Sequence, residues 1–329
     1  MLRTIGLMSG TSLDGVDAAY LETDGERIGA FGPTLTLPYD DTLRTDLRRL
    51  LTRAPGLDAD DPDLASAVTR LTEAHVAAVR ALGREADVIG FHGQTILHQP
   101  QHRRTWQIGD AEMLAARTGM RVAFDFRSAD VAAVNIGGVA NVTFIGRDGT
   151  LLAFDTGPGN GPLDDWTSRH TGAAFDRDGA LTRAGQVDRA VLGRLLADPY
   201  FARPAPKSLD RLDFAARLEA SGVDQLSPAD GAATLVAFTA GAVAGAALPE
   251  RPVRWLVTGG GRRNPAIMGG LAAALGVPVA PVETVGWDGD ALEAQCFGFL
   301  AARTLAGLPV SFPGTTGVAV PMTGGQVVG

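Results

Sequence analysis

The hydrophobic pattern at the start of the chain predicts a hairpin. Residues 3–8 and 16–23 are apolar runs of strand length, a glycine-containing turn separates them, and Asp24-Gly25 follows the second run as a strong turn signal. Residues 62–82 then carry apolar side chains at every third or fourth position, up to Gly83. This spacing predicts an amphipathic helix that ends at the glycine.

Strands and helices alternate after this helix. Residues 87–91 and 121–126 are predicted to be buried strands, and Asp110 is predicted to cap a helix over residues 111–118 that ends at Gly119. Alternation of this kind is typical of an α/β lobe.

The layout of the first hairpin begins again at Val134. Residues 134–149 (VNIGGVANVTFIGRDG) repeat the order of residues 5–25, with an apolar strand, a glycine turn, a second apolar strand and Asp-Gly. We interpret the repeat as two lobes, residues 1–133 and 134–329. The predicted fold class is a two-lobed α/β fold of the actin and hexokinase type (ribonuclease H-like ATPase), with the active site in the cleft between the lobes.

Two C-terminal features complete the predicted layout. A last helix over residues 291–305 is followed by a tail rich in proline and glycine, which is expected to pack back on the first lobe. Residues 231–248 carry no charge and reach the minimum length of a membrane span. Because they are mostly alanine and glycine and lack aromatic or basic anchors, they are predicted to form a buried helix and not a membrane span.

Composition narrows the function classes. The 37 acidic and 29 basic residues give a net charge of -8, which disfavours nucleic-acid binding because phosphate backbones need clustered cations. Lys207 is the only lysine, so the chain has no G-x-x-x-x-G-K-[ST] loop and is not a P-loop NTPase. The single cysteine, Cys296, and an N-terminus without a long apolar run predict a cytoplasmic protein without internal disulfides.

Two glycine-rich segments are candidates for nucleotide binding. The turn GTSLDG from Gly10 to Gly15 offers backbone N–H groups, two hydroxyls and a carboxylate, which suits phosphate binding with Mg²⁺ nearby. The alternative is a plain hairpin turn, and the corresponding glycine turn of the repeat, Gly137-Gly138, favours the phosphate interpretation. Residues 258–261 (TGGG) follow a predicted strand over residues 255–257 and carry no side chain large enough to exclude a nucleotide.

Asp155 is the candidate general base. In residues 152–160 (LAFDTGPGN) it ends an apolar strand and enters a glycine-rich loop. A fixed carboxylate at such a position can take a proton from a nucleophile that approaches a phosphoryl or anomeric centre. The alternative is an Asx-turn or the N-cap of a helix that begins near Pro162.

Other polar groups have both functional and structural interpretations. Residues 91–98 (FHGQTILH) directly follow a predicted strand, where open α/β sheets bind ligands, and their histidines are interpreted as hydrogen-bonding or loop-orienting residues. Residues 124–130 (FDFRSAD) could hold sugar hydroxyls and a carboxylate, or form a surface ion pair. His75 is predicted to be a hydrogen-bonded core residue. Asp290 and Glu293 have the spacing of a capping box.

Eight segments together resemble the motif series of the anhydro-N-acetylmuramic acid kinase family, in order and over most of the chain: MSGTSLDGVDAA, FHGQTILHQP, WQIGDAEMLA, DFRSAD, NIGGVANVTF, FDTGPGN, VTGGGRRN and ALEAQCFGFLA. The resemblance implies a reaction that depends on ATP and Mg²⁺. In it, 1,6-anhydro-N-acetylmuramic acid is hydrolysed and phosphorylated together, giving N-acetylmuramic acid 6-phosphate for peptidoglycan recycling. The resemblance also implies a homodimer.

The same resemblance implies roles for individual residues. Asp155 would deprotonate the water that attacks C1 while O6 takes the γ-phosphoryl group, and Mg²⁺ would bind mainly through the ATP phosphates. The residues implied to bind ATP are Gly10, Thr11, Ser12, Leu13, Asp14, Gly15, Val16, Asp17, Gly137, Gly138, Gly259, Gly260, Gly261 and Asn264. The residues implied to orient the sugar are Thr95, Arg127, Asp130 and Glu293.

Two stretches depart from the family pattern. A family segment that includes GGQGAPL is absent between Ala133 and Val134, either because it is deleted or because disordered residues are missing from the numbering. The second explanation predicts a Cα separation beyond the trans-peptide spacing of about 3.8 Å at this junction. Residues 206–211 match only loosely, and we expect this to affect the edge of the second lobe and not the chemistry.

Two other functions remain open from the sequence. One is a kinase of the same fold that acts on another sugar or a carboxylate. The other is an inactive protein that binds nucleotide and muropeptide.

Overall fold

The computed structural model describes residues 1–10, 13–58, 60–99, 104–125, 134–145, 150–209 and 214–329. The chain divides into two compact units. Unit 1 is Met1–Asp130 with Ala291–Gly329, and unit 2 is Val131–Asp290. The first boundary lies close to the one predicted at residue 133. The sequence-based division gave all of residues 134–329 to the second lobe, whereas the structure groups Ala291–Gly329 with unit 1.

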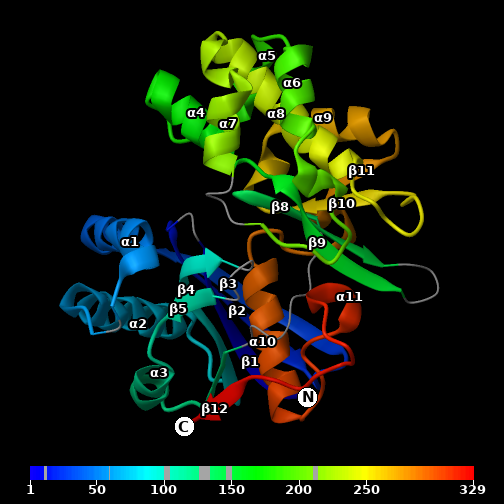
Figure 1. Ribbon diagram of the computed structural model, residues 1–329. Coiled ribbons are helices and arrows are strands. Elements are labelled where there is room, and N and C mark those ends of the chain that lie inside the picture. The colour runs from blue at the N-terminus through cyan, green and yellow to red at the C-terminus, as the bar shows by residue number, and fades with distance from the viewer. Residues whose placement is uncertain (11–12, 59, 100–103, 126–133, 146–149, 210–213) are drawn as a thin grey trace. The chain divides into compact units, whose positions relative to one another are not determined.

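Unit 1 (Figure 1) contains the strands β1 Leu2–Ser9, β2 Gly15–Thr23, β3 Ile28–Pro38, β4 Val88–Gln99, β5 Arg104–Ile108, β6 Val122–Phe124 and β12 Gln326–Val328, and the helices α1 Asp41–Arg53, α2 Pro62–Leu82, α3 Ala111–Thr118, α10 Leu292–Leu305 and α11 Pro313–Thr316. Unit 2 contains the strands β7 Val134–Ile136, β8 Val139–Ile145, β9 Leu151–Pro158, β10 Trp255–Thr258 and β11 Val279–Pro281, and the helices α4 Gly161–Thr171, α5 Ala180–Arg183, α6 Arg189–Leu196, α7 Ala215–Ser221, α8 Pro228–Ala244 and α9 Pro265–Leu275.

The two sheets share one topology. The order is β3-β2-β1-β4-β6 in unit 1, where β12 extends the β6 edge and β5 pairs with β4, and β9-β8-β7-β10-β11 in unit 2. In each sheet the first three strands pair in antiparallel fashion, and the next two run parallel to the first strand. The repeated layout predicted from residues 134–149 is therefore confirmed, and with it the two-lobed α/β fold class.

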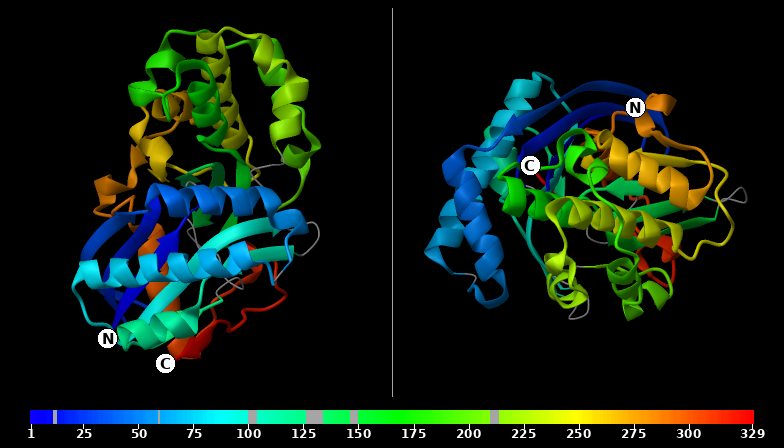
Figure 2. Two further views of the ribbon diagram at one scale, coloured as in Figure 1. Left: turned by 90° about the vertical axis from the view of Figure 1, so that its left-hand side faces the viewer. Right: turned by 90° about the horizontal axis from the view of Figure 1, so that it is seen from above.

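Helices cover both faces of the unit 1 sheet. The predicted amphipathic helix is α2, which begins after the Asp61 cap and ends at Gly83 in the left-handed conformation. Its apolar face joins Ile5 and Leu7 of β1 in one core cluster, and Figure 2 (left) shows α1 and α2 in front of this sheet. Successive residues of a strand face opposite sides of the sheet, so Gly6, between Ile5 and Leu7, faces α10 on the other side.

Close contact with the sheet explains why α10 belongs to unit 1. A Cβ at Gly6 of β1 would lie 1.6 Å from the carbonyl oxygen of Ala294, so only glycine permits this approach. The tail after α10 continues on the same unit. Its strand β12 pairs with β6 in antiparallel fashion, with Val327 opposite Ala123, so the end of the tail lies on the unit 1 sheet.

Helix α8 forms the centre of the helical layer of unit 2. It contacts α4, α5, α6 and α9 as well as β8 and β9, and most of its side chains are buried. The predicted buried helix is thus confirmed, but it spans Pro228–Ala244 and not residues 231–248, since Gly245 is its C-cap. Within the described ranges, the chain has no helix whose length and apolar character would let it cross a membrane.

Candidate active site

Three hydrogen bonds hold Asp155 on β9. Its backbone N–H donates to the carbonyl oxygen of Lys207 at 3.0 Å, and its own carbonyl oxygen accepts the hydroxyl of Tyr200 at 2.6 Å. Its half-buried carboxylate accepts the backbone N–H of Leu209 through Oδ2 at 2.8 Å. The alternative role as an N-cap is wrong, because α4 begins at Gly161 with Asn160 in the N-cap position. Residues 206–209 lie against Asp155, and not only at an edge of the second lobe as expected.

The glycine turn at Gly137-Gly138 and the loop after Asp155 form one hydrogen-bonded piece. The backbone N–H of Gly159 donates to the carbonyl of Gly138 at 3.1 Å, and that of Asn160 donates to Gly137 at 2.8 Å. A Cβ at Gly159 would lie 1.9 Å from the carbonyl oxygen of Gly137. The glycine is therefore required for this contact.

Asn160 provides a candidate ligand acceptor beside the turn. Its Nδ2 donates to the carboxylate of Asp164, whereas its Oδ1 is buried and has no hydrogen-bond partner within the described part of the chain. Buried polar atoms are normally paired, so Oδ1 is available to a donor on a bound molecule.

Close packing on β7 explains two of the three glycines at residues 259–261. A Cβ at Gly259 would lie 2.1 Å from Oδ1 of Asn135, and one at Gly261 would lie 2.3 Å from Cγ2 of Ile136. Gly260 has more space, since a Cβ there would come no closer than 3.9 Å to another residue apart from its two chain neighbours, the nearest atom being Nδ2 of Asn160. Of the three, Gly260 best fits the predicted open surface for a nucleotide.

Asn264 and Arg262 anchor the same turn. The side chain of Asn264 caps α9 by accepting two backbone N–H groups, and its Nδ2 donates to the carbonyl of Asp176 at 3.2 Å. Arg262, whose side chain is only 5% exposed, donates to the carbonyl of Gly259 at 2.9 Å and pairs with Glu283 at 2.8 Å and Asp290 at 3.0 Å. The role of Arg262 was not predicted.

The predicted capping box at the start of the last helix is wrong. Ala291 occupies the N-cap position of α10, and no side chain caps the helix there. Asp290 instead pairs with Arg262 and Arg263, because these guanidinium groups compete successfully for its carboxylate. Glu293 lies exposed in the first turn of α10.

The predicted N-terminal phosphate turn is described in part. Thr11 and Ser12 lie outside the described residues. Leu13 has a left-handed backbone (φ 58°), its side chain is 1% exposed, and its N–H donates to the carbonyl of Gly10 at 3.1 Å. Asp14 is exposed. This geometry forms a tight turn that directs the Leu13 side chain into the core.

The remaining predicted residues of this turn lie on β2. Gly15 packs against β3, because a Cβ there would lie 2.2 Å from the carbonyl oxygen of Leu37. The side chain of Val16 is fully buried in the core. Asp17 accepts the hydroxyl of Thr36 at 2.6 Å. Any phosphate contact of Val16 would thus come from its backbone.

A buried polar network joins the end of β1, just before the predicted phosphate turn, to β4. Ser9, at the end of β1, donates to Oε1 of Gln94, and the hydroxyls of Tyr39 and Ser9 are hydrogen-bonded to each other. All three side chains are at most 5% exposed, and burial raises the pKa of the Tyr39 hydroxyl. Nε2 of Gln94 donates to the carbonyl of Thr95 at 3.2 Å. The network therefore links the residue before the predicted phosphate turn to a predicted sugar-site residue, a link that no local pattern indicated.

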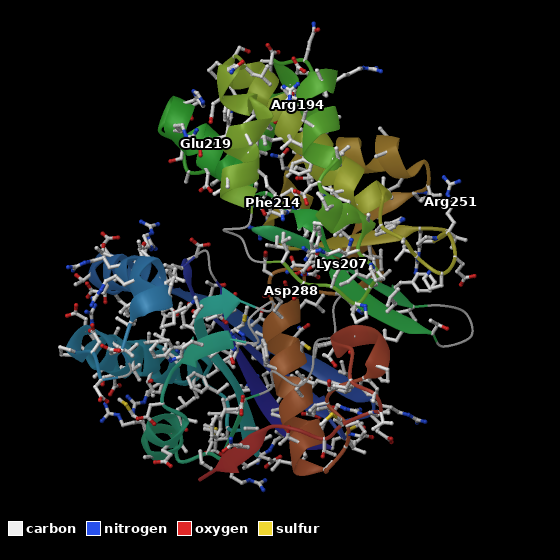
Figure 3. All side chains as sticks on the ribbon, in the orientation of Figure 1. Arg194, Lys207, Phe214, Glu219, Arg251 and Asp288 are labelled. Atoms are coloured by element: carbon white, nitrogen blue, oxygen red, sulfur yellow. The ribbon has the colours of Figure 1, made fainter. Side chains whose placement is uncertain are left out.

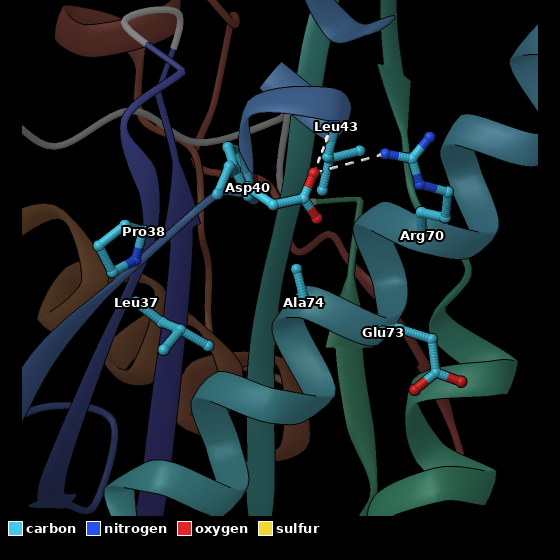
Figure 4. A pocket seen from close by; sticks show the side chains of 8 residues that line it. Leu37, Pro38, Asp40, Leu43, Arg70, Glu73 and Ala74 are labelled. Atoms are coloured by element: carbon cyan, nitrogen blue, oxygen red, sulfur yellow. Dashed lines mark hydrogen bonds and ion pairs between the residues drawn. The ribbon is translucent and has the colours of Figure 1, made fainter. Parts of the chain in front are cut away.

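Tyr39 also borders a hollow on unit 1. The hollow has a volume of about 440 Å³ and lies between the end of β3, the start of α1 and one face of α2. Figure 4 shows Asp40 and Arg70 facing each other in it, with 3.7 Å between their charged groups.

The strand that carries Thr95 is longer than predicted. Residues 91–98 were expected to follow a strand, but β4 continues to Gln99 because β5 pairs with its second half. Thr95 is half-buried on this strand, and Nδ1 of His92 is hydrogen-bonded to the carbonyl of Gly93. Two further predicted sugar-site residues, Arg127 and Asp130, lie outside the described residues.

His75 lies in the core of unit 1, as predicted. It is fully buried, its Nδ1 donates to the carbonyl of Leu71 at 2.8 Å, and its ring packs edge-on against Phe91 at 5.0 Å. Only one nitrogen is satisfied, because Nε2 has no partner among the described residues. Burial lowers the pKa of His75 to about 4.

Comparisons with known proteins extend over the whole chain. The family model described as anhydro-N-acetylmuramic acid kinase matches residues 2–134 and 131–328. The anhydro-N-acetylmuramic acid kinase of Acidiphilium cryptum (strain JF-5) is 60% identical over 352 residues, which cover 99% of this chain and 98% of the relative. That of Gluconobacter oxydans (strain 621H) is 54% identical over 363 residues, with 100% of both covered. Among solved structures, the (R)-2-hydroxyglutaryl-CoA dehydratase component A of Acidaminococcus fermentans aligns with a TM-score of 0.45 and 12% identity, covering 93% of this chain and 100% of that one.

The alignments also bear on the segment absent between Ala133 and Val134. They are longer than the 329-residue chain, so the relatives have residues that this sequence lacks. The family model matches in two pieces that meet at residues 131–134, which supports an absent segment at this junction. Ala133 lies outside the described residues, and the Cα separation predicted there stays a prediction.

Proposed function

The chain belongs to the anhydro-N-acetylmuramic acid kinase family, and we propose that it opens the 1,6-anhydro ring of anhydro-N-acetylmuramic acid and phosphorylates O6 with ATP. The products are N-acetylmuramic acid 6-phosphate and ADP, and the reaction serves peptidoglycan recycling. The observation that carries this proposal is the Asp155 carboxylate, which stands half-buried on β9 and is oriented by the N–H of Leu209.

Asp155 acts as general base in this mechanism. It takes a proton from water as the water oxygen forms a bond to C1 of the sugar. The C1–O6 bond breaks, O6 forms the new bond to the γ-phosphorus, and ADP leaves. The hydrogen bond from Leu209 to Oδ2 limits rotation of the carboxylate, so the base is held in one orientation before the substrate binds.

The two glycine turns are proposed to hold the ATP phosphates, and residues 259–261 with Asn264 to border the adenosine. The buried, unpartnered Oδ1 of Asn160 beside the Gly137-Gly138 turn supports ligand binding at this place. Among the described residues, no three His, Cys, Asp or Glu side chains form a group that could hold a metal ion. Mg²⁺ is proposed to bind mainly through ATP phosphate oxygens, where it would neutralise their charge.

Sugar recognition is assigned to four side chains. Thr95, Arg127, Asp130 and Glu293 are proposed to orient the anhydro sugar. The family match and the acidic charge of the chain support a small-molecule substrate and no nucleic-acid partner. We further propose that the protein acts in the cytoplasm as a homodimer.

The test follows heavy oxygen from water into the product. Enzyme, ATP, Mg²⁺ and anhydro-N-acetylmuramic acid are incubated in heavy-oxygen water, and the product is analysed by mass spectrometry. The label is expected at C1 and not in the phosphate, because water attacks carbon while O6 attacks phosphorus. Label in the product phosphate would contradict the mechanism. A panel of other acceptor sugars distinguishes a kinase of different specificity, and binding without turnover would indicate an inactive binding protein.

Substitution tests the base directly. Asp155→Asn is expected to bind ATP and sugar but to lose turnover by about 10²- to 10⁴-fold or more. Asp165→Asn, at an exposed position of α4, is the matched control and is expected to keep parental turnover. Activity of Asp155→Asn within tenfold of the parent would remove Asp155 from the role of base.

A further inference from the structure

One short segment, residues 200–209, makes three hydrogen bonds to Asp155 from outside the sheet that contains β9. The segment contributes the hydroxyl of Tyr200, the carbonyl of Lys207 and the N–H of Leu209. Tyr200 and Leu209 are 1% and 4% exposed. The orientation of the Asp155 carboxylate therefore depends on how firmly this segment holds its shape.

Lys207 closes the segment on itself. Its ammonium group donates to the carbonyl of Tyr200 at 3.0 Å and to that of Phe201 at 3.2 Å. It also lies 4.6 Å from the centre of the Tyr200 ring and 5.7 Å from that of Phe154, within the range of cation–π attraction. Figure 3 labels Lys207 in unit 2. The ammonium thus connects the residue that binds the carbonyl of Asp155 to the stretch that binds its N–H and carboxylate.

The lysine at this position is informative, because it is the only lysine in a chain that otherwise uses arginine. A lysine ammonium is a compact point charge that can donate to two adjacent carbonyls, whereas a guanidinium is planar and wider. Burial, with a contribution from Arg203, lowers the pKa of Lys207. The partly buried environment therefore disfavours the charged ammonium, and its contacts with backbone carbonyls and aromatic rings offset this desolvation cost.

We propose that Lys207 is a positioning residue for the catalytic base, an inference that rests on the proposed role of Asp155. The ammonium holds the Tyr200–Phe201 turn against the stretch that contains Leu209. The Tyr200 hydroxyl and the Leu209 N–H thereby fix the Asp155 backbone and carboxylate together. A displacement of a reacting group by about 1 Å can lower a rate by about 10²-fold, so loss of this closure acts on the chemical step.

The first experiment compares Lys207→Met with Arg203→Met. Methionine keeps most of the length and packing of lysine but removes the ammonium. Lys207→Met is expected to lower kcat by about 10- to 100-fold, with KM for ATP and for the anhydro sugar changed less than about threefold, since the substrate contacts remain. Arg203→Met removes a neighbouring exposed cation that also stacks on Tyr200, and it is expected to keep the parental kcat.

Two further variants keep the test decisive if Lys207→Met folds poorly. Tyr200→Phe removes only the hydroxyl that binds the carbonyl of Asp155 and is expected to lower kcat by about 3- to 10-fold. Tyr20→Phe, whose hydroxyl binds Glu22 in unit 1, is its matched control. In a Cys296→Ala background, Lys207→Cys is treated with 2-bromoethylamine. The thiolate displaces bromide and carries an ammonium at the length of lysine, which is expected to restore most of the lost kcat.

The outcomes separate this inference from the proposed function. If Asp155→Asn loses turnover while folded Lys207→Met keeps the parental kcat, the base stands and the positioning role of Lys207 is overturned. An equal loss in Lys207→Met and Arg203→Met, or aminoethylation that restores no activity, also overturns it. If Asp155→Asn itself keeps turnover, both proposals fail.

Discussion

Replacement of His75 by leucine is expected to flatten the dependence of stability on pH. His75 is fully buried in α2, and among the described residues its ring has a single hydrogen-bond partner, the carbonyl of Leu71. Its pKa is about 4, against 6.5 for an unperturbed histidine, because burial penalises the charged form. The unfolded state therefore binds a proton at a higher pH than the folded state does.

The sign and size of the effect follow from this difference. The stability that depends on neutral His75 is fully present above pH 6.5 and is lost as the pH falls from 6.5 toward 4. Between pH 7.5 and pH 5, the linkage relation gives a loss of about 2 kcal/mol from this one residue. The slope in the middle of the window is about 1.4 kcal/mol per pH unit, as expected for one proton.

Urea unfolding at several values of pH measures the effect. The parent and His75→Leu are followed by circular dichroism and tryptophan fluorescence at pH 7.5, 6.5, 5.5 and 5.0. The difference in unfolding free energy between the two proteins is compared across pH, so contributions of other titrating groups cancel. His170→Gln, which removes an exposed histidine, is the matched control. Parallel pH profiles for the parent and His75→Leu would refute the assignment of a buried, neutral histidine.

Three further substitutions test the contacts around the candidate site. Gly159→Ala forces a Cβ against the carbonyl of Gly137 and is expected to destabilise the protein by about 1–3 kcal/mol in a urea titration. Its control is Gly193→Ala, at an exposed position of α6 where no atom lies within 4 Å of the added Cβ. This change is expected to stabilise the protein by about 0.5–1 kcal/mol in the same titration. Arg262→Met removes the bonds to Gly259, Glu283 and Asp290 and is expected to lower the unfolding free energy by about 1.5–3 kcal/mol. It is also expected to raise KM for ATP more than KM for the sugar. Equal changes in the two KM values would contradict a role of Arg262 in the predicted nucleotide turn. Tyr39→Phe removes the hydroxyl that is hydrogen-bonded to Ser9 and is expected to lower the unfolding free energy by about 1–3 kcal/mol, measured by thermal unfolding. A decrease no larger than that of Tyr20→Phe would argue against the buried network.

Local patterns were sufficient for the regular elements and the repeated sheet. The apolar spacing of residues 62–82 predicted α2 with the bounds that the structure has, because a helix of this length expresses its period within a few turns. Glycine turns and Asp-Gly signals located the two hairpins, and their similar layout indicated that the two sheets share one topology. The placement of Asp155 on a strand before a glycine-rich loop could also be predicted from the sequence, because it depends on residues that are close in sequence.

Some local signals were overruled by tertiary contacts. The capping-box spacing at Asp290 and Glu293 was real, but Arg262 and Arg263 hold the Asp290 carboxylate, and α10 begins without a side-chain cap. Similarly, β4 extends past its apolar run because β5 supplies hydrogen-bond partners for the second half. In both cases hydrogen bonds or ion pairs to a residue distant in sequence stabilise the observed arrangement more than the local contacts would stabilise the predicted one.

Sequence alone thus determined the order of the elements, the repeated sheet topology and the candidate base, whereas only the tertiary structure decided how the base is held. Leu209 reaches the Asp155 carboxylate across 54 positions, and Ser9 meets Gln94 across 85. Periodicity and turn chemistry act over a few residues, so they carry no information about which distant backbone N–H or hydroxyl will face a given carboxylate. That choice is made when the strands pair and the segment around Lys207 folds against β9.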